Sequence, residues 1–493
     1  MKTIISSFNI FFKKRDNLIA FCIILFSIIG ISLNVSISST DELWNFQNVY
    51  KLYNGFEIYK DANVICTPLF FYIGNLILHL LGPNFLSFRI YNIIINVILF
   101  FSTYVLCKKL KIPKTISIIF VIILMCLKGH IIIFCMANYN TLSLAFFVIG
   151  LSCMLKENLT KKDFILQGMI AFLITFTKQN MGIYYLLAVM VVIFFEKMTV
   201  KKRMMNLFTV LILFFLLGIG SIVCFQYAGI LNGFIDYAIL GIREFGEKNI
   251  LINKPLFVFW ILVVGLNIFM IKHMKKKTLI NSKEYEKIKK VLIFSIFLTF
   301  SIFPIVNSAH FMIGMYLSWV VLGYIVNLIC LHIFKREYLK IANYGLIILI
   351  CITISNSFLH CVSWQGNRIK DKDSPYYGGI LDTETYEKIE NISEYIETSK
   401  KNVVILSHDA AFYMINLKES NGKMDLPFKG NLGAKGEEGL IEEISQMKEV
   451  EILIKKKEED MNWQESKIVR NFIIGNYEYI GEIEDFLIYT VQN

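Results

Sequence analysis

Long apolar blocks separated by short polar segments run through the first 361 residues of the chain. A transmembrane helix needs about 20 mainly apolar residues, so this pattern predicts a polytopic α-helical membrane protein. We expect eleven spans, several of them short, near residues 17–36, 90–107, 115–134, 141–155, 164–177, 181–196, 206–226, 255–271, 291–306, 311–334 and 341–361. The first span follows residues 1–16 and lacks a cleavage signature, so we expect it to remain in the protein.

Residues 362–493 follow a different pattern. Short apolar runs predict strands, and two stretches with helical periodicity and acidic outer faces predict helices. The predicted strands are Asn402–Ser407, Glu451–Leu453 and Asp485–Thr490, and the predicted helices are Thr383–Thr398 and Gly436–Lys448. This tail is long enough for a small core, so we expect it to fold alone as a soluble α/β domain.

Four glycines recur at every third position just before the second predicted helix of the tail: Gly430, Gly433, Gly436 and Gly439. A phosphate-binding loop of the P-loop type uses such glycines, but it also needs a following Lys-Ser/Thr pair, which is missing here. We therefore favour a plain glycine-rich turn over a phosphate-binding loop.

The composition agrees with a membrane protein. Hydrophobic residues make up 55% and charged residues 18% of the chain, against roughly 45–50% and 25% in an average soluble protein. All ten cysteines lie at or before Cys361 without any Cys-x-x-Cys pair, so neither a disulfide framework nor a zinc site is indicated. These features exclude a disordered chain and a small secreted disulfide-rich module.

Charge is distributed unevenly along the chain. Residues 362–493 carry 16 Lys+Arg and 25 Asp+Glu, whereas residues 1–361 carry 34 and 14. A basic stripe for nucleic acid is one interpretation of that excess. The lysines cluster between apolar blocks, however, as the positive-inside rule predicts for cytoplasmic loops. We therefore expect a cytoplasmic N-terminus, an exoplasmic tail and no nucleic-acid partner.

Pro68–Leu81 is the apolar block whose placement decides the topology, because every later loop changes side if it spans. Suppose that it lies in the membrane interface: the exoplasmic side then holds eight Lys+Arg. The cytoplasmic side holds 26, in segments 1–16, 108–114, 156–163, 197–205, 272–290 and 335–340. Most of the 26 would move to the wrong side if the block spanned, so the interfacial placement is favoured.

This topology leaves few acidic residues in the exoplasmic loops: Asp41, Glu42, Glu57, Asp61, Asp236, Glu244 and Glu247. Four of them lie in the first exoplasmic loop, residues 37–89. Ser39-Thr40-Asp41-Glu42 has the form of a capping box, and apolar residues at helical spacing up to Tyr53 predict an amphipathic helix on the outer surface. Asp41 would serve there as a base at the edge of low dielectric, or would only cap the helix.

The order of motifs in this loop resembles the GT-C membrane glycosyltransferases, which include protein mannosyltransferases, aminoarabinose transferases and lipopolysaccharide-core glycosyltransferases. The motifs are Thr40-Asp41-Glu42, Thr67-Pro68-Leu69-Phe70-Phe71-Tyr72, Leu81-Gly82 and Leu86-Ser87-Phe88-Arg89. Ala137-Asn138-Tyr139-Asn140 and Thr177-Lys178-Gln179-Asn180 are similar to that family's second exoplasmic motif and its Thr-Lys-Gly/Gln segment. The resemblance covers roughly residues 15–200 and extends loosely to residue 361.

The resemblance implies a GT-C fold over residues 17–361 and transfer of a sugar from a polyprenyl-phosphate or -diphosphate carrier to a glycan, lipid or protein acceptor. Such transfer needs a general base for the acceptor hydroxyl and cations for the leaving phosphate. Asp41 is our candidate base, with Glu42 as second candidate or orienting group. The candidates for substrate or phosphate binding are Arg89, Lys178, Asn140, Arg243, Lys248 and His310.

Ordinary roles remain open for some of these residues. Arg243 and Lys248 are also explained as exposed loop cations, and His310 as a hydrogen-bonded histidine at the interface. Two positions depart from the family pattern: Asn140 stands where several members have a second Asp, and Cys66 where the aminoarabinose branch has a Glu. The sequence therefore assigns no cofactor and leaves the need for a divalent metal open.

Two other classes would also use lipid-linked sugars. A transporter or flippase is expected to bury charged residues within its spans, and these spans contain almost none. A polysaccharide polymerase usually carries its major outer loop late in the membrane part, not directly after the first span. We therefore expect a multi-pass glycosyltransferase of the cell membrane that acts at the outer surface.

Overall fold

The structure, a computed structural model of the chain, describes residues 2–37, 41–126, 136–248, 250–274, 281–334, 338–346, 348, 368–415, 431–457 and 466–492. The chain divides into two units. The helical unit comprises residues 1–35, 89–218 and 252–364, and the mixed unit comprises residues 36–88, 219–251 and 365–493. Each unit is described by itself.

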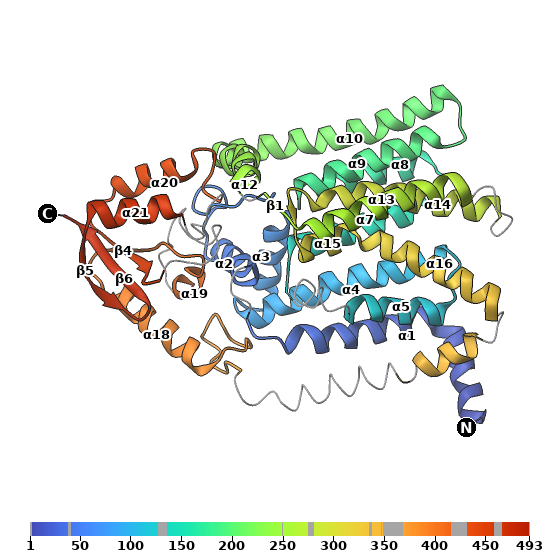
Figure 1. Cartoon of the computed structure of the whole chain (residues 1–493), viewed down its shortest axis with the longest axis horizontal. Coiled ribbons are helices and arrows are strands. Elements are labelled where there is room, and N and C mark those ends of the chain that lie inside the picture. The colour runs from blue at the N-terminus through green and yellow to red at the C-terminus, as the bar shows by residue number, and fades with distance from the viewer. Residues whose placement is uncertain are drawn as a thin grey trace. The chain divides into compact units, whose positions relative to one another are not determined.

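The helical unit is built from the apolar blocks of the sequence. Its main helices are α1 (Lys2–Leu33), α4 (Phe85–Lys109), α5 (Lys114–Cys126), α7 (Tyr139–Met154), α8 (Lys161–Thr175), α9 (Gln179–Phe195), α10 (Val200–Tyr227), α13 (Lys254–His273), α14 (Ser282–Thr299) and α16 (Tyr316–Phe334). Helix α8 packs between α7 and α9, and α14 contacts α9, α13 and α16 (Figure 1). One large apolar cluster, with Phe147, Tyr185 and Phe294 among its buried members, joins these helices.

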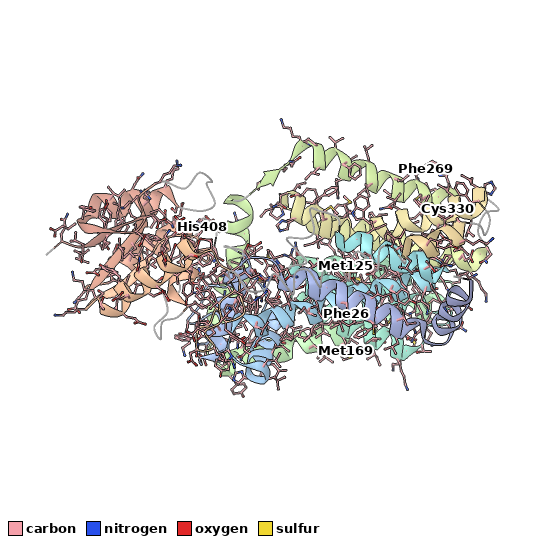
Figure 2. All side chains as sticks on the ribbon, turned by 90° about the horizontal axis from the view of Figure 1, so that it is seen from below. Phe26, Met125, Met169, Phe269, Cys330 and His408 are labelled. Atoms are coloured by element: carbon pink, nitrogen blue, oxygen red, sulfur yellow. The ribbon has the colours of Figure 1, made fainter. Side chains whose placement is uncertain are left out.

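Several helices present apolar side chains outward. Figure 2 labels Phe26, Met169 and Phe269, which lie on α1, α8 and α13 and are exposed. Few residues of α10 and α13 are buried although both helices are strongly apolar, an arrangement that is costly in water and favourable in lipid. Among the described residues, α4, α10, α13 and α16 are long and apolar enough to cross a membrane.

Shorter apolar helices coincide with other predicted spans: Asn17–Leu33, Lys114–Met125, Tyr139–Met154 and Gln179–Phe195. The apolar helix Leu69–Leu81 coincides with the block predicted to lie in the membrane interface. The structure therefore supports a helical membrane protein, while the number of eleven spans stays a prediction. Residues 127–135 and 351–361, parts of two predicted spans, lie outside the described residues.

The region of the ninth and tenth predicted spans is interrupted. Helix α14 ends at Thr299 and is followed by a 3-10 turn, η3 (Phe300–Ile302), and by β2 (Ile305–Val306). A short helix, α15 (Ser308–Gly314), then precedes α16. The Asn307 side chain accepts a hydrogen bond from the His310 N–H at 2.9 Å and so caps α15. This cap starts a new helix in the connection between the ninth and tenth predicted spans, and Met315 separates α15 from α16 within the tenth.

The mixed unit contains a four-stranded sheet in the order β3 (Asn402–Ile405), β4 (Val450–Lys455), β6 (Phe486–Val491) and β5 (Tyr477–Ile483). Strands β3 and β4 are parallel, and β6 is antiparallel to both of its neighbours. Helices α20 (Gly436–Ser445) and α21 (Lys467–Asn476) share a core with the sheet that includes Ile444, Ile452 and Ile473. Two further helices are α18 (Thr383–Thr398) and α19 (Ala411–Met414).

The strands and helices predicted for the tail are confirmed, with small differences at their ends. The sequence pattern did not predict α21 or β5. Strand β5 lies at the edge of the sheet and most of its residues are exposed or half-buried, so it lacks the alternation of apolar residues that reveals a strand.

The loop predicted to be exoplasmic, residues 37–89, belongs to the same unit as the tail up to Phe88. It contains α2 (Asp41–Tyr53) and α3 (Leu69–Leu81). Backbone hydrogen bonds join the two chain segments: Ile37 N–H to the Ile380 carbonyl at 2.9 Å, Phe85 N–H to Pro375 at 2.8 Å and Leu86 N–H to Tyr377 at 2.9 Å. The Asn63 side chain also donates to the Asn431 carbonyl at 2.7 Å. The tail therefore packs with the loop, and its independent folding stays a prediction.

A third segment completes the mixed unit with α11 (Leu231–Gly233), the π-helix η1 (Phe234–Leu240), α12 (Gly241–Lys248) and the start of β1 (Leu251–Ile252). The Asp236 carboxylate accepts a hydrogen bond from the Ala434 N–H at 3.0 Å. Gly433 has a φ of +75°, and a Cβ there would lie 2.8 Å from Asp236 Oδ2. The glycines before α20 therefore allow a tight turn with a close contact to a protein carboxylate, as a glycine-rich turn requires.

Candidate functional site

Helix α2 begins at Asp41 and ends at Tyr53, within the bounds that the sequence predicts. The capping residue Ser39 lies outside the described residues. The Asp41 side chain is exposed, whereas the neighbouring Glu42 is buried. Desolvation by surrounding protein raises the pKa of the Asp41 carboxyl above its ordinary value. The Asp41 carboxyl is therefore more basic than that of a free aspartate.

Aromatic packing holds α2 in place within the mixed unit. The Phe46 ring lies 5.2 Å from the Phe85 ring and 5.3 Å from the Phe88 ring, centroid to centroid. Trp44 contacts Phe71 on α3 edge to face, at 6.3 Å. Rings at these separations contribute specific geometry in addition to buried area. The position of Asp41 at the start of α2 is therefore set by a packed aromatic core.

The burial of α2 differs from the prediction of an amphipathic helix on the outer surface. Its polar residues Glu42, Asn45, Gln47, Asn48 and Lys51 are buried as well as its apolar ones. Burial lowers the pKa of Lys51 to about 7, opposed by the negative charge of Asp61. Tertiary packing therefore buries the polar face of α2, which the sequence pattern predicted to be exposed to solvent.

The other acidic residues of this loop stabilise a turn. Asp61 Oδ2 accepts a hydrogen bond from the Glu57 N–H at 2.7 Å, and Lys60 forms an exposed ion pair with Glu57 at 2.8 Å. Asp61, the next candidate base after Glu42, is therefore engaged by the backbone. Asp41 is therefore a better candidate for the general base than Asp61.

The helical unit brings Asn140 and Lys178 together. Lys178 is the N-cap residue of α9, and its ammonium group donates to Asn140 Oδ1 at the start of α7. The same ammonium lies 6.0 Å from the centre of the Tyr139 ring. The Asn138 side chain accepts from the Asn140 N–H at 2.7 Å and so fixes the beginning of α7. Two segments that resemble family motifs thus form one contact, in which a neutral amide binds a cation.

The positive charge of the Lys178 ammonium group also acts on His310. Burial, and then the Lys178 ammonium, lower the pKa of His310 to about 3, so the imidazole is neutral at physiological pH. Its Nδ1 lies 2.9 Å from Asn307 Oδ1. Lys178 and Asn140 therefore contact each other directly, and the charge of Lys178 acts on His310. We call these three residues the lysine cluster.

Arg89 binds backbone carbonyls at the end of α1. Its guanidinium is buried and donates to the Ser32 carbonyl at 2.6 Å and to the Val35 carbonyl at 3.3 Å, at the C-terminal end of α1. Asn92 adds a hydrogen bond to the Ser32 hydroxyl at 3.0 Å. A cation at a helix C-terminus satisfies carbonyls that the helix leaves unpaired. These contacts give the arginine in the first turns of α4 a structural role.

The remaining predicted cations lie in the mixed unit, on α12. Arg243 is exposed, and the side chain of Lys248, the last residue of α12, lies outside the described part of the chain. Asp41 and Glu42 are in the mixed unit too, whereas Arg89 and the lysine cluster are in the helical unit. The structure therefore assembles the lysine cluster from the predicted residues and leaves the others on separate elements.

Sequence reasoning missed Asn307 and Tyr139 as neighbours of the cluster. Asn307 lies between the ninth and tenth predicted spans and precedes a run of apolar residues, which is the usual signal of an N-cap. Among the described residues, no group of three or more His, Cys, Asp or Glu side chains is arranged to hold a metal ion.

The geometry thus defines a helical membrane protein with a small α/β sheet and two polar centres, one at Asp41 and one at Lys178. No model of a known protein family matches the sequence, and no protein of established function matches it significantly. The functional assignment therefore rests on the chemistry of these two centres.

Proposed function

We propose that this protein is a membrane glycosyltransferase that moves a sugar from a polyprenyl-phosphate-linked donor to an acceptor hydroxyl at the outer face of the membrane. The observation that carries the proposal is Asp41, an exposed carboxylate of raised pKa at the start of a helix that aromatic packing holds in place. The motif order that resembles GT-C enzymes supports the same assignment.

The proposed reaction needs one base. The acceptor oxygen attacks the anomeric carbon, the bond from that carbon to the phosphate oxygen breaks, and the phosphate leaves with the bonding electron pair. The hydroxyl proton passes to the Asp41 carboxylate, which must therefore be ionised at the start. Desolvation, by raising the pKa of Asp41, makes it a stronger acceptor for that proton.

The lysine cluster is suited to the leaving phosphate. A phosphate that gains negative charge is stabilised by a nearby cation. Asn140 accepts from Lys178 without neutralising it, and His310 is uncharged at physiological pH. The resemblance implies that Lys178 binds substrate or phosphate, and Asn140 contacts its ammonium group.

The contacts of the helical unit are consistent with the proposed eleven-span topology. Segments 108–114, 156–163 and 272–290 are predicted to be cytoplasmic together. Ion pairs join them: Lys111 with Glu284, and Lys283 with Glu157 at 3.0 Å. Helix α3 exposes Tyr72, Leu76 and Leu80 at a spacing of four residues. An exposed apolar face on a 13-residue helix suits the membrane interface better than a full span.

Replacement of Asp41 by Asn tests the proposal. Asn keeps the size of the side chain but cannot take up a proton, so transfer from a polyprenyl-phosphate sugar should fall by roughly 10²–10⁴-fold at equal membrane levels. Asp61→Asn is the matched control, because that carboxylate is engaged in a turn of the same loop. Near-normal transfer by the Asp41→Asn variant would remove Asp41 as the base. Movement of the labelled lipid across vesicles without any transfer would favour the transporter instead.

A further inference from the structure

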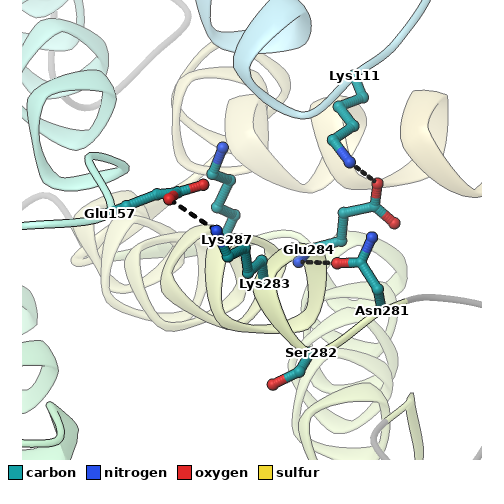
Figure 3. A pocket seen from close by; sticks show the side chains of 7 residues that line it. All are labelled: Lys111, Glu157, Asn281, Ser282, Lys283, Glu284 and Lys287. Carbon is teal, nitrogen blue, oxygen red and sulfur yellow. Dashed lines mark hydrogen bonds and ion pairs between the residues drawn. The ribbon is translucent and has the colours of Figure 1, made fainter.

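A cavity of about 280 Å³ lies in the helical unit, apart from both polar centres. Three connections line it: the turn after α4 with Lys111, the connection after α7 with Glu157, and the first turns of α14 with Lys283, Glu284 and Lys287 (Figure 3). Its volume is near the lower end of small-molecule sites, which measure roughly 300–1,000 Å³. The cavity is therefore large enough for a phosphate group with one small substituent.

The charges around the cavity do not cancel. Lys111 pairs with Glu284, and Lys283 pairs with Glu157 at 3.0 Å. Lys283, and more weakly Lys287 and Lys111, hold the pKa of Glu157 below its ordinary value, so all three lysines act on the same space. Three ammonium groups thus face two carboxylates, and the excess positive charge belongs to Lys287.

The lysines retain hydrogen-bond donors for a ligand. An ammonium group has three N–H bonds, and one carboxylate contact leaves others available on Lys111 and Lys283. The N-terminus of α14 is itself capped, because Asn281 Oδ1 accepts from the Glu284 N–H at 2.9 Å. Binding of an anion would therefore depend on the lysine side chains, not on the helix end.

The cavity lies where apolar helices end. Helix α4 ends at Lys109 and α7 at Met154, while α14 becomes apolar only after Lys290. Basic residues at such a level lie among the phosphates of the lipid headgroups, and basic pockets between membrane helices bind anionic headgroups. Charge counting predicts that this end of the helical unit is cytoplasmic.

We propose that this cavity binds a phosphate-bearing anion through Lys287, Lys283 and Lys111, supplied either by the headgroup of an acidic phospholipid or by a free phosphate. The site is independent of the proposed glycosyl transfer, and its loss is not expected to abolish that reaction. Bound anion would link three connections of the helical unit and so stabilise it.

Equilibrium binding to the purified full-length protein in uncharged detergent tests the site, with short-chain phosphatidylglycerol, short-chain phosphatidylcholine and inorganic phosphate as probes. The wild type should bind phosphatidylglycerol at least about tenfold more tightly than phosphatidylcholine. Lys287→Gln should weaken that binding about tenfold, and Lys287→Arg should retain it. Lys289→Gln is the matched control, because Lys289 lies on the same helix but pairs with Glu286 at 3.7 Å and does not line the cavity.

The probes distinguish the two sources of phosphate. Binding of phosphatidylglycerol without inorganic phosphate identifies a lipid headgroup, and comparable binding of inorganic phosphate identifies a free anion. Equal losses for Lys287→Gln and Lys289→Gln would show only general attraction to a basic surface and would overturn the site, as would the absence of binding to both anionic probes. An unchanged unfolding temperature of Lys287→Gln without ligand would show that the variant is folded.

Discussion

The contact between Asn140 and Lys178 shows how one uncharged side chain sets the charge of a site. An aspartate at position 140 would form an ion pair with Lys178, and the pair would carry no net charge. The amide orients the same ammonium group without neutralising it. Under the proposed function, this ammonium group would attract an anionic phosphate.

Asn140→Asp should therefore weaken use of an anionic donor. We expect the KM for the polyprenyl-phosphate sugar to rise about tenfold, since the new carboxylate would both repel the phosphate and occupy the ammonium group. Asn180→Asp is a suitable control, because the Asn180 side chain accepts from the Met181 N–H at 2.8 Å and lies in the same connection. Equal KM values for wild type and Asn140→Asp would contradict the assignment of Lys178 to the phosphate.

The pH dependence of activity should identify the titrating group. Asp41 acts as a base only when ionised, so kcat/KM should fall as the pH drops through its pKa, which desolvation raises above the ordinary value of about 3.9. His310, with a pKa of about 3, stays neutral above that pH. The acid limb should consequently persist in His310→Gln. Its disappearance in that variant would identify the histidine, not Asp41, as the titrating group.

At the scale of elements, α2 has an aromatic face that packs against its neighbours and a polar face that is buried. Its aromatic face fixes it against α3, and its buried polar face includes Lys51, which is 5% exposed. A buried ammonium group is costly because the charged form loses its hydration. The helix is thus positioned by packing and carries an electrostatic cost within the same thirteen residues.

Lys51→Met should stabilise the protein near neutral pH. With a folded-state pKa of about 7 against 10.5, Lys51 makes stability rise with pH between those values, because the unfolded chain then binds more protons. Below about pH 7 the whole cost of the buried charge is present. Removal of the charge should add roughly 1–3 kcal/mol at pH 6 and flatten the rise of the unfolding temperature above pH 7.

Lys60→Met provides the comparison for this change, because Lys60 is exposed and only pairs with Glu57 on the surface. It should alter stability by less than about 1 kcal/mol. Thermal unfolding of both variants in detergent from pH 6 to 10 measures the difference. A destabilised Lys51→Met variant with the original pH dependence would show that the lysine is charged and well compensated.

At the scale of the whole molecule, residues 36–88 and the tail belong to one folded unit, although most of the helical unit lies between them in sequence. Their contact includes backbone hydrogen bonds and the close approach of Gly378 to Leu86. Helix α19 of the tail also contacts α2. A change in the tail can therefore reach the helix that carries Asp41 through direct packing.

Gly378→Ala should disturb both stability and activity. Gly378 has a φ of +80°, and a Cβ there would lie 2.7 Å from Leu86 Cβ, so the substitution is strained and overpacked. We expect a loss of about 1–3 kcal/mol and reduced transfer. Gly475→Ala is the matched control, because a Cβ there meets nothing within 4 Å. Unfolding temperature and transfer rate measure the effect, and equal behaviour of the two variants would show that the loop and tail do not depend on this contact.

The sequence by itself determined the elements whose residues have a clear period. Helix α2 runs over Asp41–Tyr53 and α18 over Thr383–Thr398 as predicted, and three of the four strands in the sheet of the tail were found, because burial on one face imposes a period that survives in any tertiary context. The edge strand β5 was not predicted, because its residues are largely exposed or half-buried and burial therefore imposes no period on them.

Only the tertiary structure decided which distant residues meet. The pairing of Lys178 with Asn140, the capping of α1 by Arg89 and the joining of the loop to the tail depend on contacts between segments far apart in the chain. The burial of the polar face of α2 was hidden for the same reason, because local alternation predicts which face of a helix is apolar but not what later packs against the other one.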